Sequence, residues 1–483
     1  MAKNLYEELT RPQRSRRRHP LLRALRWGLL LYLLYFAVGA LAPFAFHPPV
    51  SAAVQASFDP AAFYGSGSPD RAALVLGNQD ALDLRLQMIA QAQESIVLTS
   101  FDIRDCQSTR DLFAALLAAS ERGVRIQILW DGFSGFLRGR APVFYALGSR
   151  DNVEIRFYNE PNFLLPWTFN GRMHDKYLIV DHQLMVLGGR NTFDLFLGNY
   201  VPDSDKSHDN DVLIWNTAAT AEESVIGQVE DYFAQVWAQR DSRPVLDAAP
   251  FWRAGAVEEA EAALRALPSY QAVPARLDYA ALTVPVDRCT LLTNPTGILA
   301  KEPVLWWQLQ QLMEGAEERV YLQTPYAVPS REMYEGLARV AAKGIPFALQ
   351  INSVAVGDNF VASSDYLTNR DRLLDTGATV WEWFGDYSSH GKAALIDDLA
   401  LVGSYNFDMR STYLDTEMML VFDSPDLLAL LEEHLSAMEA QCLQAVPEGY
   451  LPRPGVEEKP YQDPKSVFYP VTRWITQPFR FLL

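Results

Sequence analysis

The stretch RMHDKYLIVD, residues 172–181, and the stretch SHGKAALIDD, residues 389–398, carry the same three side chains at the same spacing. In each, a histidine stands two residues before a lysine and seven before an aspartate: His174, Lys176 and Asp181, then His390, Lys392 and Asp397. Both stretches are β-like, and residues i and i+2 of a strand share a face. Each copy therefore presents an imidazole beside an ammonium group. The duplication predicts two repeats that close around one site.

The segments around the two triplets repeat as well. Strand-like residues 94–103 precede an amphipathic segment that ends in glycine and a second strand at 124–132, and the same order recurs over 318–353. This alternation predicts an α/β fold with mostly parallel sheets covered by helices on both faces. We expect four units: repeats at 76–240 and 305–444, a linker with a short helix at 241–304, and a tail at 445–483.

The triplets favour an anion over a metal ion. A lysine two residues from each histidine repels a cation, and no HExxH or CxxC arrangement supplies further ligands. Two imidazoles and two ammonium groups suit a phosphoryl group, because the lysines neutralise its oxygens while one histidine attacks phosphorus and the other protonates the departing alcohol. Imidazole suits both tasks because its unperturbed pKa is ~6.5. No metal ion is expected.

Small-residue turns that end in asparagine follow both triplets, with GGRN at 188–191 and GSYN at 403–406. Glycine permits a close backbone approach to a ligand. The side chains of Asn191, Ser404 and Asn406 can donate hydrogen bonds to phosphate oxygens. The two turns therefore predict a phosphate-binding surface beside the histidines.

Carboxylates follow at two kinds of position. The segments DNDVLI and DTEMML align and bring Asp211 opposite Glu417. A carboxylate bonded to one imidazole nitrogen fixes the tautomer, so both are predicted to orient the histidines. Asp181 and Asp397 belong to the catalytic triplets by spacing, but each falls at a predicted hairpin turn with strand parity opposite to its histidine. We expect these two to act through the surrounding structure.

The N-terminal region predicts a membrane anchor. A basic segment, residues 1–26 with the run RPQRSRRRH, precedes the uncharged residues Trp27–Phe46, which match the ~20 residues that cross a bilayer as a helix. Positive charges stay in the cytoplasm, which places the body outside the cell membrane. A cleaved signal peptide, with ALA at 40–42 as its cleavage site, is the alternative. The C-terminal FYPVTRWITQPFRFLL fits either a membrane interface or packing on the body.

These motifs resemble the phospholipase D superfamily, in which two HxKxxxxD motifs meet across a pseudo-twofold axis. NGRMHDKYLIVD with GGRN, and SHGKAALIDD with GSYNFDMRS, resemble bacterial cardiolipin synthases of that type. The resemblance implies tandem α/β/α repeats side by side. It also implies that His174 forms a phosphohistidine, that His390 is acid and then base, and that no cofactor is required. Lys176, Lys392, Asn191 and Asn406 would hold the phosphate.

The resemblance leaves several functions to be compared. A membrane-anchored phosphatidyltransferase would pass a phosphatidyl group to an alcohol such as phosphatidylglycerol, and hydrolysis to phosphatidic acid would differ only in the hydroxyl that reaches the intermediate. The segment VAVGDNFVASSDYLTNRDRLL lacks the His-Ala-Gly run associated with these synthases, which leaves the acceptor open. A nucleic-acid phosphodiesterase needs a basic groove, which a net charge of −17 disfavours, so no nucleic-acid partner is expected. Two intact triplets disfavour a noncatalytic scaffold.

Overall fold

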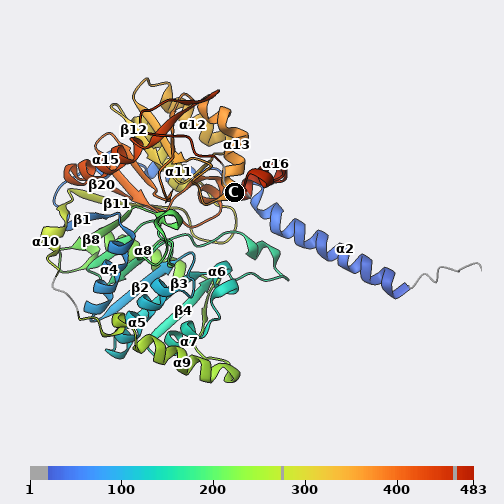
Figure 1. Ribbon diagram of the computed structural model, residues 1–483, viewed down its shortest axis with the longest axis vertical. Helices are drawn as coiled ribbons and strands as arrows, with labels where there is room; N and C mark the ends of the chain where they lie inside the picture. The colour runs from blue at the N-terminus through green and yellow to red at the C-terminus, as the bar shows by residue number, and fades with distance from the viewer. Residues whose placement is uncertain (1–19, 274–276, 461–464) are drawn as a thin grey trace, which may run out of the picture.

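Two sheets of nine strands each dominate the computed structural model, which describes residues 20–273, 277–460 and 465–483 (Figure 1). The first sheet has the order β10 (Val284–Pro285), β1 (Asp70–Val75), β8 (Asp211–Asn216), β6 (Leu184–Leu187), β5 (Tyr177–Val180), β2 (Ser95–Ser100), β3 (Arg125–Asp131), β4 (Val153–Tyr158), β9 (Ser242–Val245). The second has the order β11 (Arg288–Thr293), β20 (Met418–Asp423), β18 (Leu399–Gly403), β17 (Ala393–Ile396), β12 (Val320–Gln323), β14 (Phe347–Asn352), β15 (Thr379–Trp383), β21 (Cys442–Val446), β22 (Gly449–Leu451). From β1 to β9 and from β11 to β21 the two orders correspond strand by strand, which confirms the predicted tandem repeats.

The predicted mostly parallel sheet is wrong. Only β2, β3 and β4, and their counterparts β12, β14 and β15, run parallel within the two large sheets of the described chain. Strands β5 and β17 begin directly after Lys176 and Lys392 and are called the histidine strands. They form antiparallel hairpins with β6 and β18, and β8 and β20 return antiparallel beside these hairpins. Short apolar strands do not reveal their direction, because periodicity reports which face is buried and not the neighbour.

Helices cover the outer face of each sheet. The crossover helix α5 (Gln107–Glu121) links β2 to β3, and α12 (Arg331–Ala341) links β12 to β14. Each is followed by a glycine in the left-handed region, with φ of 92° at Gly123 and 76° at Gly344, a conformation that ends a helix without steric cost. These helices pack with their sheets into separate apolar cores, one for each repeat.

A third core joins the two repeats and fixes the site. Helices α8 (Val225–Trp237) and α15 (Pro425–Glu439) lie on the inner faces, and each contacts the other repeat, α8 at β11 and α15 at β1. The buried side chains come from both sheets: Tyr177, Met185, Leu187 and Val212 from the first, and Ala393, Val402, Leu420 and Phe422 from the second. Because apolar burial drives association, this shared core holds the two histidine strands face to face.

The boundaries of the repeats differ from the expected ones. The first repeat begins with β1 at Asp70 and ends with β9, so it extends beyond residues 76–240 on both sides. The expected linker, 241–304, does contain a helix, α9 (Ala254–Arg265), which packs on α5 and α7 (Pro142–Gly148). It also supplies β10 to the first sheet and β11 to the second. The linker is therefore structural for both halves.

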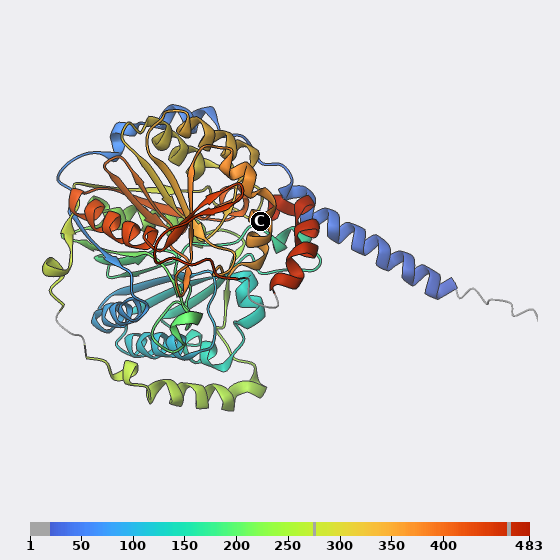
Figure 2. The same ribbon diagram turned by 45° about the horizontal axis from the view of Figure 1, so that its top comes forward.

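The base of helix α2 and the C-terminal tail lie together on one side of the body (Figures 1 and 2). Helix α2 (Pro20–Leu41) projects away from the body and is long and apolar enough to cross a membrane (Figures 1 and 2). It starts earlier than the expected Trp27 and ends before Phe46, while residues 1–19 of the basic segment lie outside the described residues. Helix α16 (Lys465–Thr476) packs on α13 (Phe360–Leu374) beside the base of α2 in both views.

Candidate active site

Each site histidine is hydrogen-bonded to a carboxylate of the other repeat. Nδ1 of His174 lies 2.7 Å from Oε1 of Glu417, and Nδ1 of His390 lies 2.7 Å from Oδ2 of Asp209. Both carboxylates are fully buried, whereas 12% of the His174 side chain and 10% of the His390 side chain are exposed. An ionised carboxylate only accepts hydrogen bonds, so each pairing favours the tautomer with the proton on Nδ1 and leaves the Nε2 lone pair for chemistry. The two crossed pairs can exist only in the folded two-repeat protein.

Side chains from distant segments hold the backbone before His174. The N–H groups of three successive residues donate to side chains: Arg172 to Asp415 (2.8 Å), Met173 to Asp131 (3.1 Å) and His174 to Thr416 (3.1 Å). Asp131, the aspartate of LWDG, also caps the helix that follows β3. The imidazole therefore stands on a backbone that both repeats fix.

A short parallel ribbon between the repeats positions His390. Strand β16 (Ser388–Ser389) pairs with β7 (Ser207–His208), and the His390 N–H donates to the carbonyl of His208 at 2.6 Å. Because Ser389 pairs with His208, the next residues along the two strands, His390 and Asp209, face each other. The isolated bridge between Met173 and Thr416 brings His174 and Glu417 together in the same way.

Both lysines lie buried beside their histidines. Lys176 Nζ donates to the backbone carbonyl of His174 at 2.5 Å, and Lys392 Nζ donates to that of His390. Lys392 Nζ also lies 3.5 Å from Asp209 Oδ2. Burial, followed by the charge of Lys392, lowers the pKa of Lys176 to about 7. Two ammonium groups enclosed together are mutually destabilising, so an anion placed between them is favoured.

The two histidines differ in their electrostatic surroundings. Burial and the nearby charge of Lys176 lower the pKa of His174 well below its ordinary value. Burial and Lys392 also lower the pKa of His390, but its hydrogen bond to Asp209 opposes that shift. Burial alone would raise the pKa of Asp209, yet Lys392 and His390 hold it below its ordinary value, so Asp209 is ionised. His390 is therefore the imidazole better placed to accept and hold a proton.

Asp211 was predicted to orient a histidine, and this is wrong. Its carboxylate lies 2.7 Å from Arg85 and 3.5 Å from Arg190, deep in the first repeat. Leu187 pairs with Val212 in the first sheet, whereas its counterpart Val402 pairs with Leu420 in the second. The correct alignment is therefore two residues away from the one expected. It matches Asp209, not Asp211, with Glu417.

The turns that follow the histidine hairpins differ in their contacts. Ser404 was expected to hold phosphate, but its hydroxyl donates to Glu417, and Ser411 donates to the other oxygen of Glu417 at 2.6 Å. At the position matching Ser404, a Cβ on Gly189 would lie 2.4 Å from Asp209 Oδ2. The shorter aspartate thus needs the glycine, and the longer glutamate has room for a serine.

The two asparagines predicted to bind phosphate lie at the ends of these turns. Asn191 Oδ1 accepts the N–H of Asp102 at 3.2 Å, and Asn406 Nδ2 donates to the hydroxyl of Tyr326 at 3.2 Å. Asp102 and Tyr326 occupy matching positions after β2 and β12. Both asparagines are therefore held at corresponding points of the two repeats. Their predicted contact with phosphate stays a prediction.

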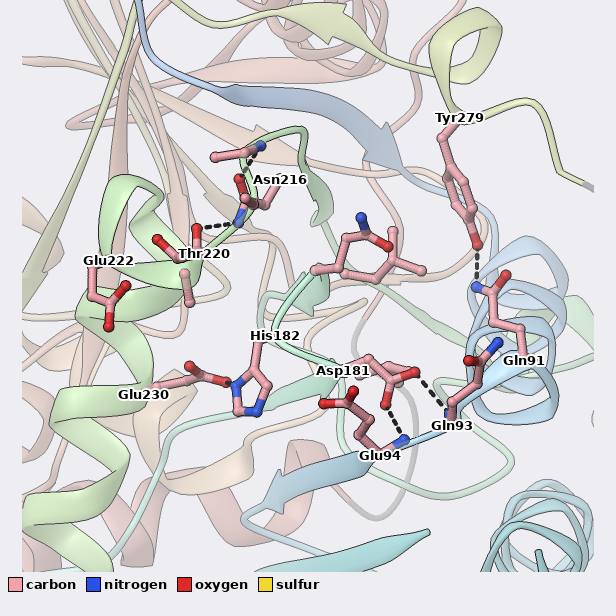
Figure 3. A pocket seen from close by; sticks show the side chains of 16 residues that line it. Gln91, Gln93, Glu94, Asp181, His182, Asn216, Thr220, Glu222, Glu230 and Tyr279 are labelled. Carbon is pink, nitrogen blue, oxygen red and sulfur yellow. Dashed lines mark hydrogen bonds and ion pairs between the residues drawn. The ribbon is translucent and has the colours of Figure 1, made fainter.

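Asp181 and Asp397 lie at the opposite ends of the histidine strands and do not enter the site. Both have left-handed backbones, with φ of 52° and 48°, as their hairpin turns require. Asp181 accepts the N–H groups of residues 93–95 at 2.8–2.9 Å, and Asp397 accepts those of residues 317–319 at 2.8–3.0 Å. Figure 3 shows Asp181 in a polar cavity of about 760 Å³ whose lining includes neither site histidine. These contacts agree with the structural role expected of both, and their place in the catalytic set stays a prediction.

Several contacts of the site were not predicted. Phe101 meets the His174 ring edge-to-face at 5.1 Å between centroids, and Phe196 meets the His390 ring in the same way at 5.0 Å. The contacts of Asp209 with His390 and of Ser411 with Glu417 were not predicted either. The only sequence signal for Asp209 is that it stands two residues before Asp211 and so shares its strand parity.

Comparison with known proteins agrees with this geometry. The family model described as "Cardiolipin synthase, PLD-like domain" matches residues 86–237 and 309–439. The chain belongs to the cardiolipin synthase family of phospholipase D-like proteins. It is 28% identical to cardiolipin synthase C of Escherichia coli strain K12, over 73% of this chain and 81% of that protein. Cardiolipin synthase A of Pseudomonas syringae is 25% identical, over 75% of this chain and 67% of that protein.

A solved structure shares the fold. The crystal structure of phosphatidylserine synthase from Haemophilus influenzae superposes with a TM-score of 0.59 at 15% identity, covering 87% of this chain and 97% of that one. At this identity the likeness shows the architecture and not the substrate. Family membership makes the chain a phospholipase D-type enzyme of phospholipid metabolism.

Proposed function

We propose that this protein is a membrane-anchored phosphatidyltransferase that works through a phosphohistidine on His174. The observation that carries the proposal is the crossed arrangement of the two imidazole–carboxylate pairs, with a buried lysine beside each histidine. One phosphodiester between the histidines would meet a nucleophile on one side and a proton donor on the other. The similarity to cardiolipin synthases supports a phospholipid as that diester.

The difference between the histidines supports the assignment of their roles. A nucleophile must be neutral, and the pKa of His174 is held well below its ordinary value. An acid must be protonated, and His390 faces the ionised Asp209. Binding of an anionic diester raises the pKa of both imidazoles, because an opposite charge favours the protonated form. His390 then becomes the proton donor, while His174, which begins lower, keeps its lone pair.

The transfer takes two balanced steps. Nε2 of His174 attacks phosphorus, the bond from phosphorus to the departing alcohol breaks, and His390 gives its proton to that alcohol. An acceptor alcohol then gives its proton to the neutral His390, its oxygen attacks phosphorus, and the nitrogen–phosphorus bond breaks. With phosphatidylglycerol as both donor and acceptor, the products are cardiolipin and glycerol. With water as the acceptor, the product is phosphatidic acid.

Helix α2 supports action at a membrane surface. It is apolar over a length sufficient to cross a bilayer, and only 6% of its most apolar stretch is buried against the body. We propose that the N-terminus lies in the cytoplasm and the two repeats on the other side, because the basic residues precede the helix.

The test uses purified full-length protein with phosphatidylglycerol vesicles. We expect equal amounts of cardiolipin and glycerol. Phosphatidic acid without cardiolipin would contradict transfer and establish hydrolysis. When the wild-type protein is denatured during turnover of ³²P-phosphatidylglycerol, acid-labile label should be found on His174, and it should be absent from His174→Ala. His182→Ala is the matched control, since His182 pairs with Glu230 at the remote cavity of Figure 3 and should leave turnover unchanged.

A further inference from the structure

The loop that leads into the first histidine segment lies along helix α2. Tyr32 donates its hydroxyl to the carbonyl of Phe163 at 2.9 Å, and Tyr35 donates to that of Leu164 at 2.6 Å. The ring of Phe36 stacks on Phe163 with centroids 6.2 Å apart. Despite these contacts, Phe163 is 55% exposed and Leu164 is 73% exposed. An apolar tip thus protrudes from the body beside the helix.

The position of these contacts along α2 sets how deep the loop lies in a bilayer that α2 crosses. Tyr32 stands nine residues before Leu41, the last residue of the helix, which is about 14 Å at 1.5 Å per residue. A bilayer has a hydrocarbon core of about 30 Å. Where α2 crosses a bilayer, the loop that is hydrogen-bonded to Tyr32 and Tyr35 is surrounded by the same acyl chains.

The backbone of the loop is suited to that environment. Asn162 folds the tip into a turn, because its side chain accepts the N–H of Leu164 at 2.9 Å and its carbonyl accepts that of Leu165 at 2.9 Å. The Asn162 N–H donates to the hydroxyl of Thr168 at 2.8 Å. With the two tyrosine hydroxyls, these bonds occupy polar groups that would be costly to leave unpaired in lipid.

Helix α16 presents a second apolar face on the same side of the molecule. Its inner face is anchored: Tyr469 is buried and stacks on Phe360 at 4.5 Å, and Arg473 donates to Thr368 at 3.0 Å. Its outer face carries four large apolar side chains with exposures between 55% and 85%: Phe468, Val471, Trp474 and Ile475. A helix in water places its polar residues outward, so this orientation is the one expected at a lipid surface.

One junction ties the loop, the end of α2 and the tail together. Phe44 packs with Tyr413 and Leu414, and Trp167 and Leu482 pack against the same cluster. The side chain of Asn170 donates to the carbonyl of Ala40 at 2.8 Å, which fixes the loop to the end of the helix. The cluster adjoins the site through Leu414, whose neighbour Asp415 holds the backbone of Arg172.

We propose that loop 162–169 and the outer face of α16 form a lipid-docking surface that inserts among the acyl chains of the leaflet from which α2 emerges. The occupant is a phospholipid monolayer, because the loop is bonded to a helix of membrane-spanning length and α16 lies beside the base of that helix (Figures 1 and 2). This inference rests on the anchoring in the proposed function. It deepens that function, because the docked surface continues directly into His174 and draws substrate laterally from the membrane.

The first test uses the full-length protein and measures how deeply single labelled positions lie in the membrane. A single cysteine replaces Leu164, Trp474 or, as the control, Leu430, which is 44% exposed on α15 across the body from α2 (Figure 1). Cys106 is replaced by serine, and Cys289 and Cys442 are buried. Each protein carries an environment-sensitive fluorophore and is reconstituted in phosphatidylglycerol and phosphatidylethanolamine vesicles with nitroxide-labelled acyl chains. We expect quenching at 164 and 474 and none at 430.

Quenching at 474 no greater than at 430 would overturn the role of α16, and the same result at 164 would overturn that of the loop. A signal that follows protein density rather than nitroxide content would assign the surface to a second copy of the chain, and this too would overturn the proposal. Because this measurement needs no turnover, it remains decisive even if the protein fails to make cardiolipin.

The second test measures transfer with matched charge substitutions. Leu164→Glu and Trp474→Glu should lower cardiolipin formation from vesicles by about tenfold or more, because a carboxylate enters hydrocarbon at high cost. Both should keep wild-type turnover on short-chain, soluble phosphatidylglycerol, and Leu430→Glu should match wild type on both substrates. An equal loss of turnover on both substrates together with a lowered Tm would indicate misfolding of the variant. The fluorophore measurement then decides whether the surface contacts lipid. Unchanged vesicle turnover in both variants would overturn the proposal.

Discussion

Asp209 and Asp211 lie two positions apart in one segment and hold different partners. Asp209 bonds His390, whereas Asp211 pairs with the buried Arg85 and Arg190. The sequence presents both in DND, with the same parity and the same chemistry. More residues separate Asn191 from Asp209 in the first repeat than separate Asn406 from Glu417 in the second. This difference in length hides which of the two aspartates corresponds to Glu417. Only the pairing of β6 with β8 separates the two roles.

The two aspartates should therefore respond differently to the same substitution. Asp209→Asn is expected to lower kcat by about 10²- to 10⁴-fold, because the substitution removes the ionised partner that sets the tautomer of His390. Asp211→Asn should instead lower the free energy of unfolding by about 3–5 kcal/mol, because it leaves buried arginines without their counter-charge. Steady-state kinetics and thermal unfolding of both variants check this. Equal kinetic loss in both would contradict the assignment.

Lys176 makes anion binding depend on pH near neutrality. Its pKa is lowered to about 7 by burial and Lys392, so it is charged below that pH and neutral above it. We expect the affinity for sulfate, whose own charge is constant over this range, to fall as pH rises from 6 to 8. Lys176→Arg should keep its affinity, because guanidinium stays protonated. Inhibition constants measured across that range test this, and a flat wild-type profile would refute it.

Asp181 and Asp397, the two aspartates of the hairpin turns, show how a turn side chain fixes a neighbouring strand. Spacing alone assigns Asp181 and Asp397 to a catalytic triplet, whereas parity and turn position indicate a structural role, with which their contacts agree. Each binds three consecutive N–H groups at the start of β2 or β12 and so fixes the strand beside the histidine strand. The strand–helix–strand units were predictable from apolar periodicity. The antiparallel return strands were not, because their partners lie far away in the sequence.

Asp397→Ala is expected to lower the free energy of unfolding by about 1–3 kcal/mol while kcat of the folded protein stays near wild type. Burial alone would raise the pKa of Asp397, but the three backbone N–H groups lower it below its ordinary value. Its stabilisation is therefore present above the unfolded pKa and is lost as pH falls through the lower folded value. Urea unfolding at pH 7 and pH 3 measures both effects. Asp398→Ala, at the exposed neighbouring position, is the control.

The arrangement of the whole molecule follows from joining two similar halves through their inner faces. The sequence predicts the pseudo-twofold repeat, and the paired sheets confirm it. It does not predict that each histidine is completed by the opposite half, because that depends on the parallel ribbon of β7 with β16 and on the bridge between Met173 and Thr416. Such contacts join residues more than 180 positions apart and leave no periodic signal.

The proposed topology predicts which side of the membrane the body occupies. Leu282→Cys places a thiol on α10 (Tyr279–Leu282), where the native leucine is 50% exposed and lies across the body from α2 (Figure 1). In intact cells this thiol should react with a membrane-impermeant maleimide, and the parent protein should show only the background from its own cysteines. For Gram-negative cells the outer membrane is permeabilised first. Labelling only after the inner membrane is disrupted would place the body in the cytoplasm.

The crossed imidazole–carboxylate pairs also govern when reactivity can first arise during biosynthesis. A ribosome releases the segment bearing His174 well before it has translated Glu417, and the nascent first half has no group to set the tautomer of that imidazole. Under the proposed mechanism, the protein is therefore inert toward lipid until its last third has been made and has docked. Under that mechanism, an unfinished or truncated chain held in a bilayer by α2 would leave the phospholipids around it intact.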